Sequence, residues 1–193
     1  MNEVNKILLE QKRKQLQLKL SIQNWLQGWV PIFNAIRQWN KLWSFEYFDC
    51  ANETDLSFWE KSLEKSPLAA LEIPLSAIKT PLEYYVHDKM RALFPSSLSL
   101  RYMPVLLHRE AYETDSALML TKIAETLNIF AEEEVFLFYT RFTPVLRLPF
   151  SAVCLLREEE IMNPENLCIM PLDYRWLIFR SLENEWVWGE HKV

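Results

Sequence analysis

The sequence predicts an α+β fold in which N-terminal helices precede a mainly antiparallel sheet, with a helix between strand groups and a C-terminal β-hairpin. Segments of good helix formers dominate the first half of the chain, whereas alternating and aromatic-rich runs dominate the second half. The strand-like runs follow one another without the helical crossovers that a parallel sheet needs. With 193 residues, 50% of them hydrophobic, the chain is long enough to bury its own core.

Two helices are expected at the N-terminus. Residues 4–27 contain no Gly or Pro and are rich in Leu, Gln, Lys and Glu, which predicts one long helix. Gly28 suits a C-terminal cap, and Pro31 suits the first turn of a second helix that runs to about Trp43. The apolar face of this second helix combines Ile32, Ile36, Trp39 and Trp43. Such a tryptophan stripe is usually core, and the alternative is a docking face for a partner helix.

Three further helices are predicted. Residues 54–66 form a short helix capped by Asn52 or Thr54, and Thr80–Glu83 is a capping box with Pro at the first helical position. The helix that this box opens reaches about Phe94. The last helix, 115–130, has Thr114 as its expected cap. The side chains expected to point inward from the last two helices are Leu82, Val86, Met90, Leu93, Leu118, Ile123, Leu127 and Phe130.

The period changes to two in the remaining segments, which predicts strands. The predicted strands are residues 98–103, 135–142, 145–156, 174–180 and 185–188. Pro149 points to an edge or a bulge, because proline cannot donate to a sheet ladder. The last two strands flank a four-residue loop and form the expected C-terminal hairpin.

Charge is distributed unevenly along the chain. Residues 1–43 carry seven basic and two acidic side chains, whereas residues 44–193 carry fourteen basic and twenty-four acidic ones, a net charge of −10. We expect residues 1–45 to form a helical arm packed on an α+β body, 46–193, within one compact domain. The weaker alternative is that the arm, through Lys12-Arg13-Lys14, binds an anionic membrane or nucleic acid.

Glycine and cysteine usage excludes several classes. Two glycines cannot build a phosphate-binding glycine loop or a dinucleotide fingerprint. Cys50, Cys154 and Cys168 are far apart and form no C-x-x-C pair, so reduced, buried thiols are the simplest interpretation. The sequence contains neither a signal peptide nor an apolar run of about 18 residues. We therefore expect a cytoplasmic protein without a cofactor or metal.

Two glutamate clusters and two tryptophans are the candidate partner-binding residues. The clusters lie at element boundaries, where like charges are solvated or face a basic protein. Tryptophan is enriched at interface centres, although covering a core is its commoner role. The candidates are Glu132, Glu133, Glu134, Glu158, Glu159, Glu160, Trp186 and Trp188.

An anion-binding site is the alternative. Arg101, Arg141 and Arg147 lie on predicted strands, and together with His108 they could bind a phosphate or carboxylate group if they shared a face. Otherwise each arginine pairs with a neighbouring glutamate. His108 and Glu110 have the spacing of two metal ligands on a strand, a short pattern with many chance occurrences.

The expected function is therefore a non-enzymatic protein-binding protein, such as an inhibitor or immunity-type protein that neutralises a basic partner. The alternative is a small intracellular enzyme that acts on an anionic substrate through the strand arginines and His108. The net charge of the strand-bearing region argues against nucleic acid as a partner.

Overall fold

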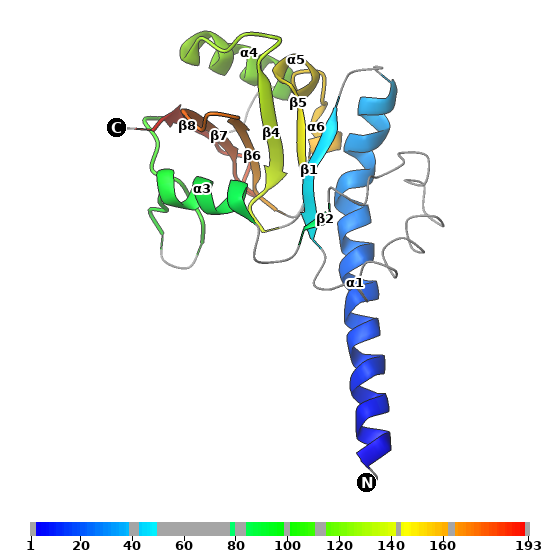
Figure 1. Cartoon of the computed structure of the whole chain (residues 1–193). Coiled ribbons are helices and arrows are strands. Elements are labelled where there is room, and N and C mark those ends of the chain that lie inside the picture. The colour runs from blue at the N-terminus through cyan, green and yellow to red at the C-terminus, as the bar shows by residue number, and fades with distance from the viewer. Residues whose placement is uncertain are drawn as a thin grey trace.

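The computed structural model describes residues 3–38, 43–49, 78–79, 84–98, 101–110, 115–141, 144–161 and 165–191 (Figure 1). Its described elements confirm the α+β class, because helices pack on a mainly antiparallel sheet that ends in a C-terminal hairpin. The predictions for residues 54–66, for the capping box at 80–83 and for Cys50 lie outside these residues.

The sheet has the strand order β2-β1-β5-β4-β6-β7-β8-β3. All neighbouring strands pair antiparallel except β1 and β2, which pair parallel at one edge. The strands are β1 Ser44–Asp49, β2 Ile78–Lys79, β3 His108–Glu110, β4 Glu134–Tyr139, β5 Val145–Pro149, β6 Leu167–Pro171, β7 Trp176–Arg180 and β8 Trp186–Glu190.

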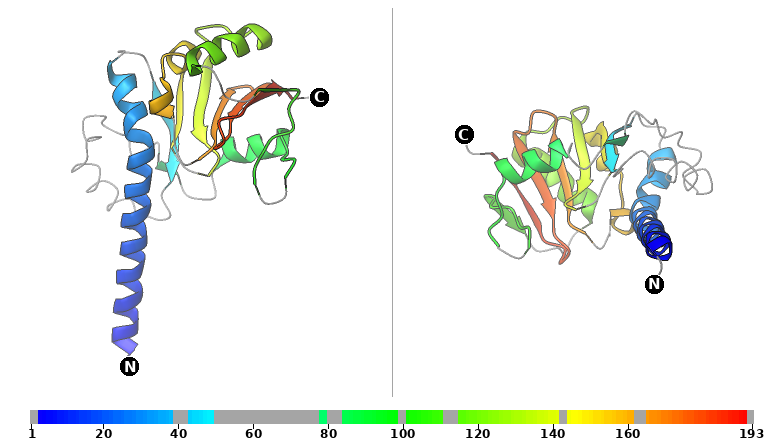
Figure 2. Two further views of the ribbon diagram at one scale, coloured as in Figure 1. Left: turned by 180° about the vertical axis from the view of Figure 1, so that it is seen from behind. Right: turned by 60° about the horizontal axis from the view of Figure 1, so that its bottom comes forward.

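Both faces of the sheet are covered (Figure 2). The described helices are α1 Glu3–Gln38, α3 Tyr85–Leu93, α4 Ser116–Leu127, α5 Phe150–Val153 and α6 Glu158–Ile161. The C-terminal part of α1 shares one core with α4, α5 and α6, whereas α3 packs into a second core on the opposite face. Alternate residues of β4 serve the two cores: Leu137 and Tyr139 face the first, and Phe136 and Phe138 face the second.

The predicted break between two N-terminal helices is wrong, because α1 runs without interruption through Pro31 to Gln38. Proline removes one backbone hydrogen bond from a helix interior. Trp29 precedes Pro31, and Ile32 and Phe33 follow it, and all three side chains are 0–1% exposed. Their burial against the sheet offsets the lost bond and keeps the helix in one piece.

Two of the predicted strands differ from the structure. Residues 101–103 belong to no strand, because the Ser96 hydroxyl bonds to backbone groups of Leu98, Arg101 and Met103 and closes a loop instead. The predicted strand 145–156 ends at Pro149, and α5 begins at the next residue. Proline has no N–H to donate to the ladder, so the strand stops there.

The helix α4 begins one residue later than predicted. Its cap is Asp115, whose carboxylate accepts a hydrogen bond from the Ala117 N–H at 2.8 Å. Leu118 and Phe130, predicted to be buried, are 63% and 75% exposed. The buried stripe instead follows the helical period through Ser116, Met119, Leu120, Ile123 and Leu127.

Candidate protein-interaction surface

The N-terminal part of α1 extends away from the sheet and the other helices (Figures 1 and 2). We call residues 3–20 the projecting helix. Six of its large apolar side chains are 50–68% exposed: Val4, Ile7, Leu8, Leu9, Leu16 and Leu20. Exposed apolar side chains gathered on one element are typical of a protein or membrane contact, whereas single ones need no explanation.

One side of the projecting helix continues a face that is buried further along α1. Val4, Ile7 and Leu8 are three and four residues apart, so they share a side. Leu8 lies three heptads before Trp29, which packs edge-on against Tyr139 with a ring separation of 4.8 Å. The helix therefore carries the same kind of surface in its free part as in the part that packs on the body.

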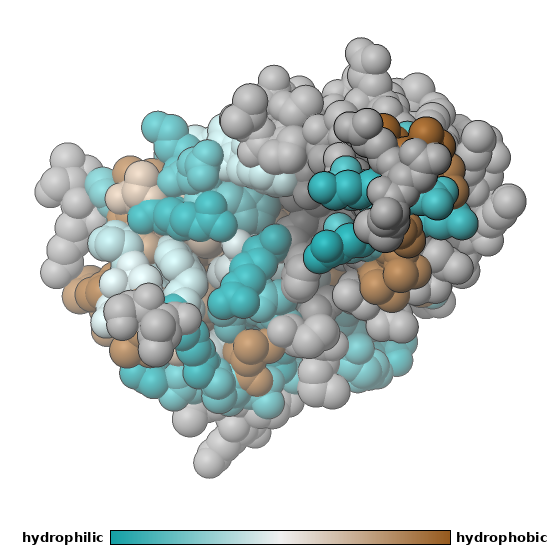
Figure 3. Space-filling model, turned by 90° about the horizontal axis from the view of Figure 1, so that it is seen from below, coloured by the Kyte–Doolittle hydropathy of each residue, from teal (hydrophilic) through white to brown (hydrophobic). Residues whose placement is uncertain are grey.

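The opposite side carries a leucine stripe with basic flanks. Leu9, Leu16 and Leu20 are seven and four residues apart, which places them together. Lys12 and Arg13 each lie one turn from both Leu9 and Leu16, on the two flanks of the stripe. The sequence-based prediction did not include this stripe, although the spacing of the three leucines is visible in the sequence. Figure 3 shows polar and apolar side chains side by side on the side of the molecule toward which the projecting helix points.

The first glutamate cluster is largely occupied by ion pairs within the chain. Glu133 and Glu134 bind Arg175 and Arg147, with N–O distances of 2.5 Å in both pairs. The Arg147 guanidinium lowers the pKa of Glu134. Glu132 is exposed and forms no ion pair with the described residues. Two of the three carboxylates thus have a cation partner within the described part of the chain.

The second cluster is occupied in the same way. Glu158 accepts hydrogen bonds from the Arg180 guanidinium and the Ser116 hydroxyl, and so joins β7 to the start of α4. Glu159 lies 3.7 Å from Arg157, and Glu160 accepts a hydrogen bond from the backbone N–H of Arg157 at 2.8 Å. Of these contacts, those of Glu158 join α6 to other elements, whereas those of Glu159 and Glu160 are local to the start of α6.

Trp186 and Trp188 lie in the core rather than on the surface. They are 0% and 3% exposed, and Trp186 packs beneath Arg180, whose guanidinium lies 5.8 Å from the ring centre. His108 stacks on Trp188 from the exposed edge strand, with ring centres 5.4 Å apart. Both tryptophans thus take the commoner role of covering a core, and they are not exposed for partner binding.

The structure does not gather the candidate anion-binding arginines. Arg147 lies opposite Phe136 and binds Glu134 at the start of β4, whereas Arg141 follows the far end of that strand. Arg141 lies 3.8 Å from Glu165, and Arg101 forms an ion pair with Glu183. Each arginine therefore has a carboxylate partner, the arrangement weighed as the alternative to a shared site.

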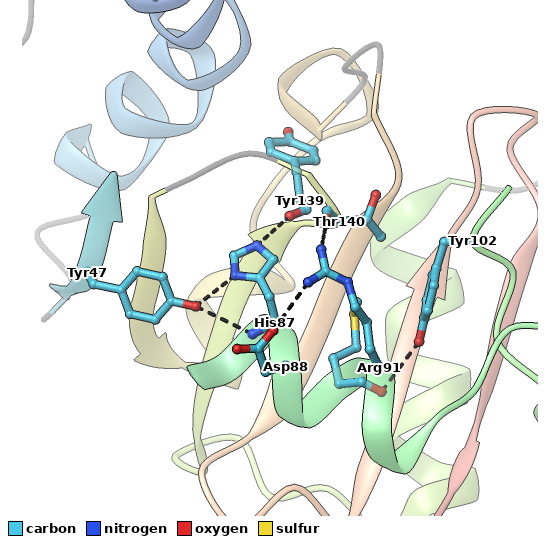
Figure 4. Close-up of polar contacts among 8 residues, drawn as sticks. Tyr47, His87, Asp88, Arg91, Tyr102, Tyr139 and Thr140 are labelled. Carbon is cyan, nitrogen blue, oxygen red and sulfur yellow. Dashed lines mark hydrogen bonds and ion pairs between the residues drawn. The ribbon is translucent and has the colours of Figure 1, made fainter. Parts of the chain in front are cut away.

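A buried polar cluster lies between α3 and the sheet (Figure 4). His87 is 3% exposed, and its Nε2 lies 2.9 Å from the carbonyl oxygen of Tyr139. Because a carbonyl only accepts, Nε2 carries the proton and Nδ1 accepts from the Tyr47 hydroxyl at 2.7 Å. Burial raises the pKa of Tyr47, which therefore stays protonated.

Both ring nitrogens of His87 are thus engaged, and their hydrogen bonds link α3 to β1 and β4. Arg91 on the same helix donates to the carbonyl oxygen of Thr140 at 3.2 Å, and Tyr102 donates to the carbonyl oxygen of Met90 at 3.4 Å (Figure 4). Tyr102 also donates to the carbonyl oxygen of Phe94 at the end of α3. The sequence showed the histidine but not its partners, because Tyr47 lies 40 residues away in the chain.

The two described cysteines, Cys154 and Cys168, are free thiols. Burial raises the pKa of the Cys154 thiol to about 11 and that of Cys168 well above its ordinary value. Because the thiolate is the nucleophile, a raised pKa leaves little reactive species at neutral pH. Cys168 is buried, as predicted, whereas Cys154 is only partly buried.

One groove opens between the C-terminal end of α3 and the segment that precedes β3, with a volume of about 410 Å³. Its lining is mainly apolar, with Glu190 and His191 at one side. Gly189 lets this segment approach β8, because a Cβ there would lie 3.2 Å from the backbone nitrogen of Leu107.

Within the described ranges, no three His, Cys, Asp or Glu residues are grouped so as to hold a metal ion. No described helix has the length and apolar character needed to cross a membrane. Comparison with protein-family models, curated proteins and solved structures finds no match to this chain.

Proposed function

We propose that this chain is a non-enzymatic protein-binding protein whose projecting helix is the element that contacts its partner. The observation that carries the proposal is the set of six apolar side chains, each at least half exposed, on residues 3–20 of α1. A partner that covered these side chains would gain roughly 25 cal/mol of free energy for each Å² of apolar surface removed from water.

The kind of partner follows from the residues beside the leucines. The flanking Lys12 and Arg13 favour a surface that is apolar at its centre and acidic at its rim, because opposite charges steer association and fix orientation. An apolar stripe with anchors one to three turns apart is the pattern of a helix that docks in a groove or along another helix. Apolar stripes on two sides of one helix suit protein neighbours better than a flat membrane surface, which can bury only one side.

A basic partner, as expected of an inhibitor or immunity-type protein, remains a second proposal. The acidic balance of residues 44–193 supports it. The ion pairs of Glu133, Glu134 and Glu158 reduce that support, since these carboxylates already have cations within the chain. A cytoplasmic location likewise remains a prediction.

Site-specific photo-crosslinking in the native cells tests the projecting helix. A benzophenone amino acid placed at Leu16 or Leu20 is expected to cross-link to protein, because these side chains face away from the body. The same probe at Leu182, which is 44% exposed in the β7–β8 loop, is the matched control. Equal cross-linking from Leu182, or none from either helix position in a folded chain, would contradict the proposal.

A further inference from the structure

We infer that the partner of the projecting helix is an acidic helix of a different protein, which pairs with the leucine stripe as a two-stranded coiled coil. Carboxylates of that helix face Lys6 and Arg13. This inference rests on the proposed function and names the chemistry of the partner.

The leucine stripe belongs to a regular seam on the projecting helix. The residues of this seam follow one another at spacings of three, four, three and four, which is the heptad spacing of helices that pair along their length. The seam consists of Lys6, Leu9, Arg13, Leu16 and Leu20, and all five are exposed. A seam of this kind suits another helix that lies along it.

Two of the five seam positions are cations, and they decide the chemistry of the partner. Lys6 and Arg13 alternate with the leucines, so a helix that covers the leucines also comes close to both cations. A charge that loses its water is stabilised only by an opposite charge beside it. The partner helix therefore presents carboxylates at these two positions and apolar side chains at the others.

Neither a second copy of the projecting helix nor a membrane has that chemistry. Residues 3–20 carry five basic and two acidic side chains, a net charge of +3, so two copies would repel each other. A helix that lies on a membrane keeps its cations on the face opposite to its apolar side chains. Here Lys6 and Arg13 lie in the same seam as the leucines.

Binding of three synthetic peptides to the full chain, followed by fluorescence anisotropy, tests the inference. All three span residues 3–20. The natural peptide has a net charge of +3, the neutral one carries Lys6→Gln/Lys12→Gln/Arg13→Gln, and the acidic one carries Glu at the same three positions. The acidic peptide should bind with a dissociation constant below about 100 μM. It should bind at least ~10-fold more tightly than the natural peptide, with the neutral peptide between them. Raising the salt to about 0.5 M should narrow the difference.

Matched variants of the full chain locate the contact. Leu16→Gln should weaken binding of the acidic peptide at least ~10-fold, because it removes an apolar side chain from the seam. Leu8→Gln makes the same change on the other side of the helix and should leave the affinity within about twofold. The exchanged chain, Lys6→Glu/Lys12→Glu/Arg13→Glu, should instead prefer the natural peptide. Circular dichroism checks the fold of each variant, which exposed substitutions should leave unchanged.

Three outcomes overturn the inference. These are equal affinity for the three peptides, binding of the acidic peptide that Leu16→Gln does not weaken, and a full chain that forms dimers through Leu16. Binding to phosphatidylserine vesicles through Leu16 without binding of the acidic peptide also overturns it. If Leu16 still cross-links to protein in cells, these results remove the acidic helix and leave the proposed function standing. Absence of cross-links instead removes the proposed function and the inference with it.

Discussion

The two ends of α1 have similar side chains and opposite environments. Trp29, Ile32, Phe33 and Ile36 are 0–1% exposed, whereas the six apolar side chains described on the projecting helix are 50–68% exposed. Helix propensity is high in residues 4–20 and low around Pro31, so the buried part stays helical through what it contacts rather than through propensity. An apolar stripe stabilises a helix only where another surface covers it, and each covered Leu, Ile or Phe contributes roughly 1.5–3 kcal/mol.

The polar groups of the body and of the projecting helix also have opposite environments. In the body His87, Tyr47 and the carbonyl of Tyr139 satisfy one another away from water. On the projecting helix Lys6, Lys12 and Arg13 have solvent around them. Removing a hydrogen-bond partner should therefore lower the free energy of unfolding more in the body than on the projecting helix.

The largest expected effect comes from truncating one side chain at each end of α1. Trp29→Ala should lower the free energy of unfolding by about 3–5 kcal/mol, because it leaves a cavity between α1 and β4. Leu16→Ala should change it by less than about 0.5 kcal/mol in dilute protein, where no partner covers that position. Urea unfolding followed by circular dichroism measures both. Equal losses would mean that the exposed end is packed in solution.

A smaller effect is expected from the polar cluster under α3. Tyr47→Phe removes the donor to His87 Nδ1 and should lower the free energy of unfolding by about 1–3 kcal/mol. Tyr85→Phe is the matched control, since Tyr85 is 38% exposed and should change stability little. Urea unfolding at neutral pH compares the two variants.

The pH dependence of this cluster has a defined sign. Burial raises the pKa of Tyr47, so its contribution is complete below the ordinary tyrosine value near 10 and is lost as pH rises toward the folded value. Wild-type protein should therefore lose stability above about pH 10 more steeply than Tyr47→Phe. Parallel curves for the two proteins would show that the hydroxyl is not buried.

Much of the fold could be predicted because local signals agreed with the long-range contacts. β4, β7 and β8 are rich in residues that favour strands, and their hairpin connections are short. The sequence did not lead us to predict β1. Its neighbours in the sheet, β2 and β5, are distant in sequence, so no short hairpin connection marks it as a strand. Leu118 was placed inside because its period was counted from the wrong residue, while Met119 and Leu120 set the actual stripe.

The candidate surface was harder to predict than the fold. Sequence periodicity shows that the leucines of α1 share sides, but it cannot tell a covered side from a free one. The glutamate clusters show the reverse problem, because Arg175 and Arg180 lie far from them in sequence yet occupy them in space. Ion pairing between distant strands is set by the sheet register, which local sequence does not contain.

Pro31 lies within the buried part of α1 and offers a stabilising change. Proline destabilises a helix interior by about 3 kcal/mol relative to alanine. Replacing proline also makes the unfolded chain more flexible, which offsets part of the stability gained. Pro31→Ala should therefore raise the free energy of unfolding by about 1–2 kcal/mol. Asn34→Ala, at an exposed position of the same helix, is the control. A loss of stability would show that the half-buried proline ring is needed for packing.

The smallest expected effect is that of a surface ion pair on the body, which should behave like the exposed charges of the projecting helix. The pKa of Glu134 is lowered by Arg147, so the pair stabilises above the ordinary glutamate value near 4.3 and loses its effect as pH falls through the lowered value. Glu134 is 52% exposed, and such pairs contribute about 0.2–1 kcal/mol. Glu134→Gln should therefore cost that amount at pH 7 and nothing near pH 2, as measured by urea unfolding at both values. Glu159→Gln, which breaks a longer and more exposed pair, should cost less at pH 7.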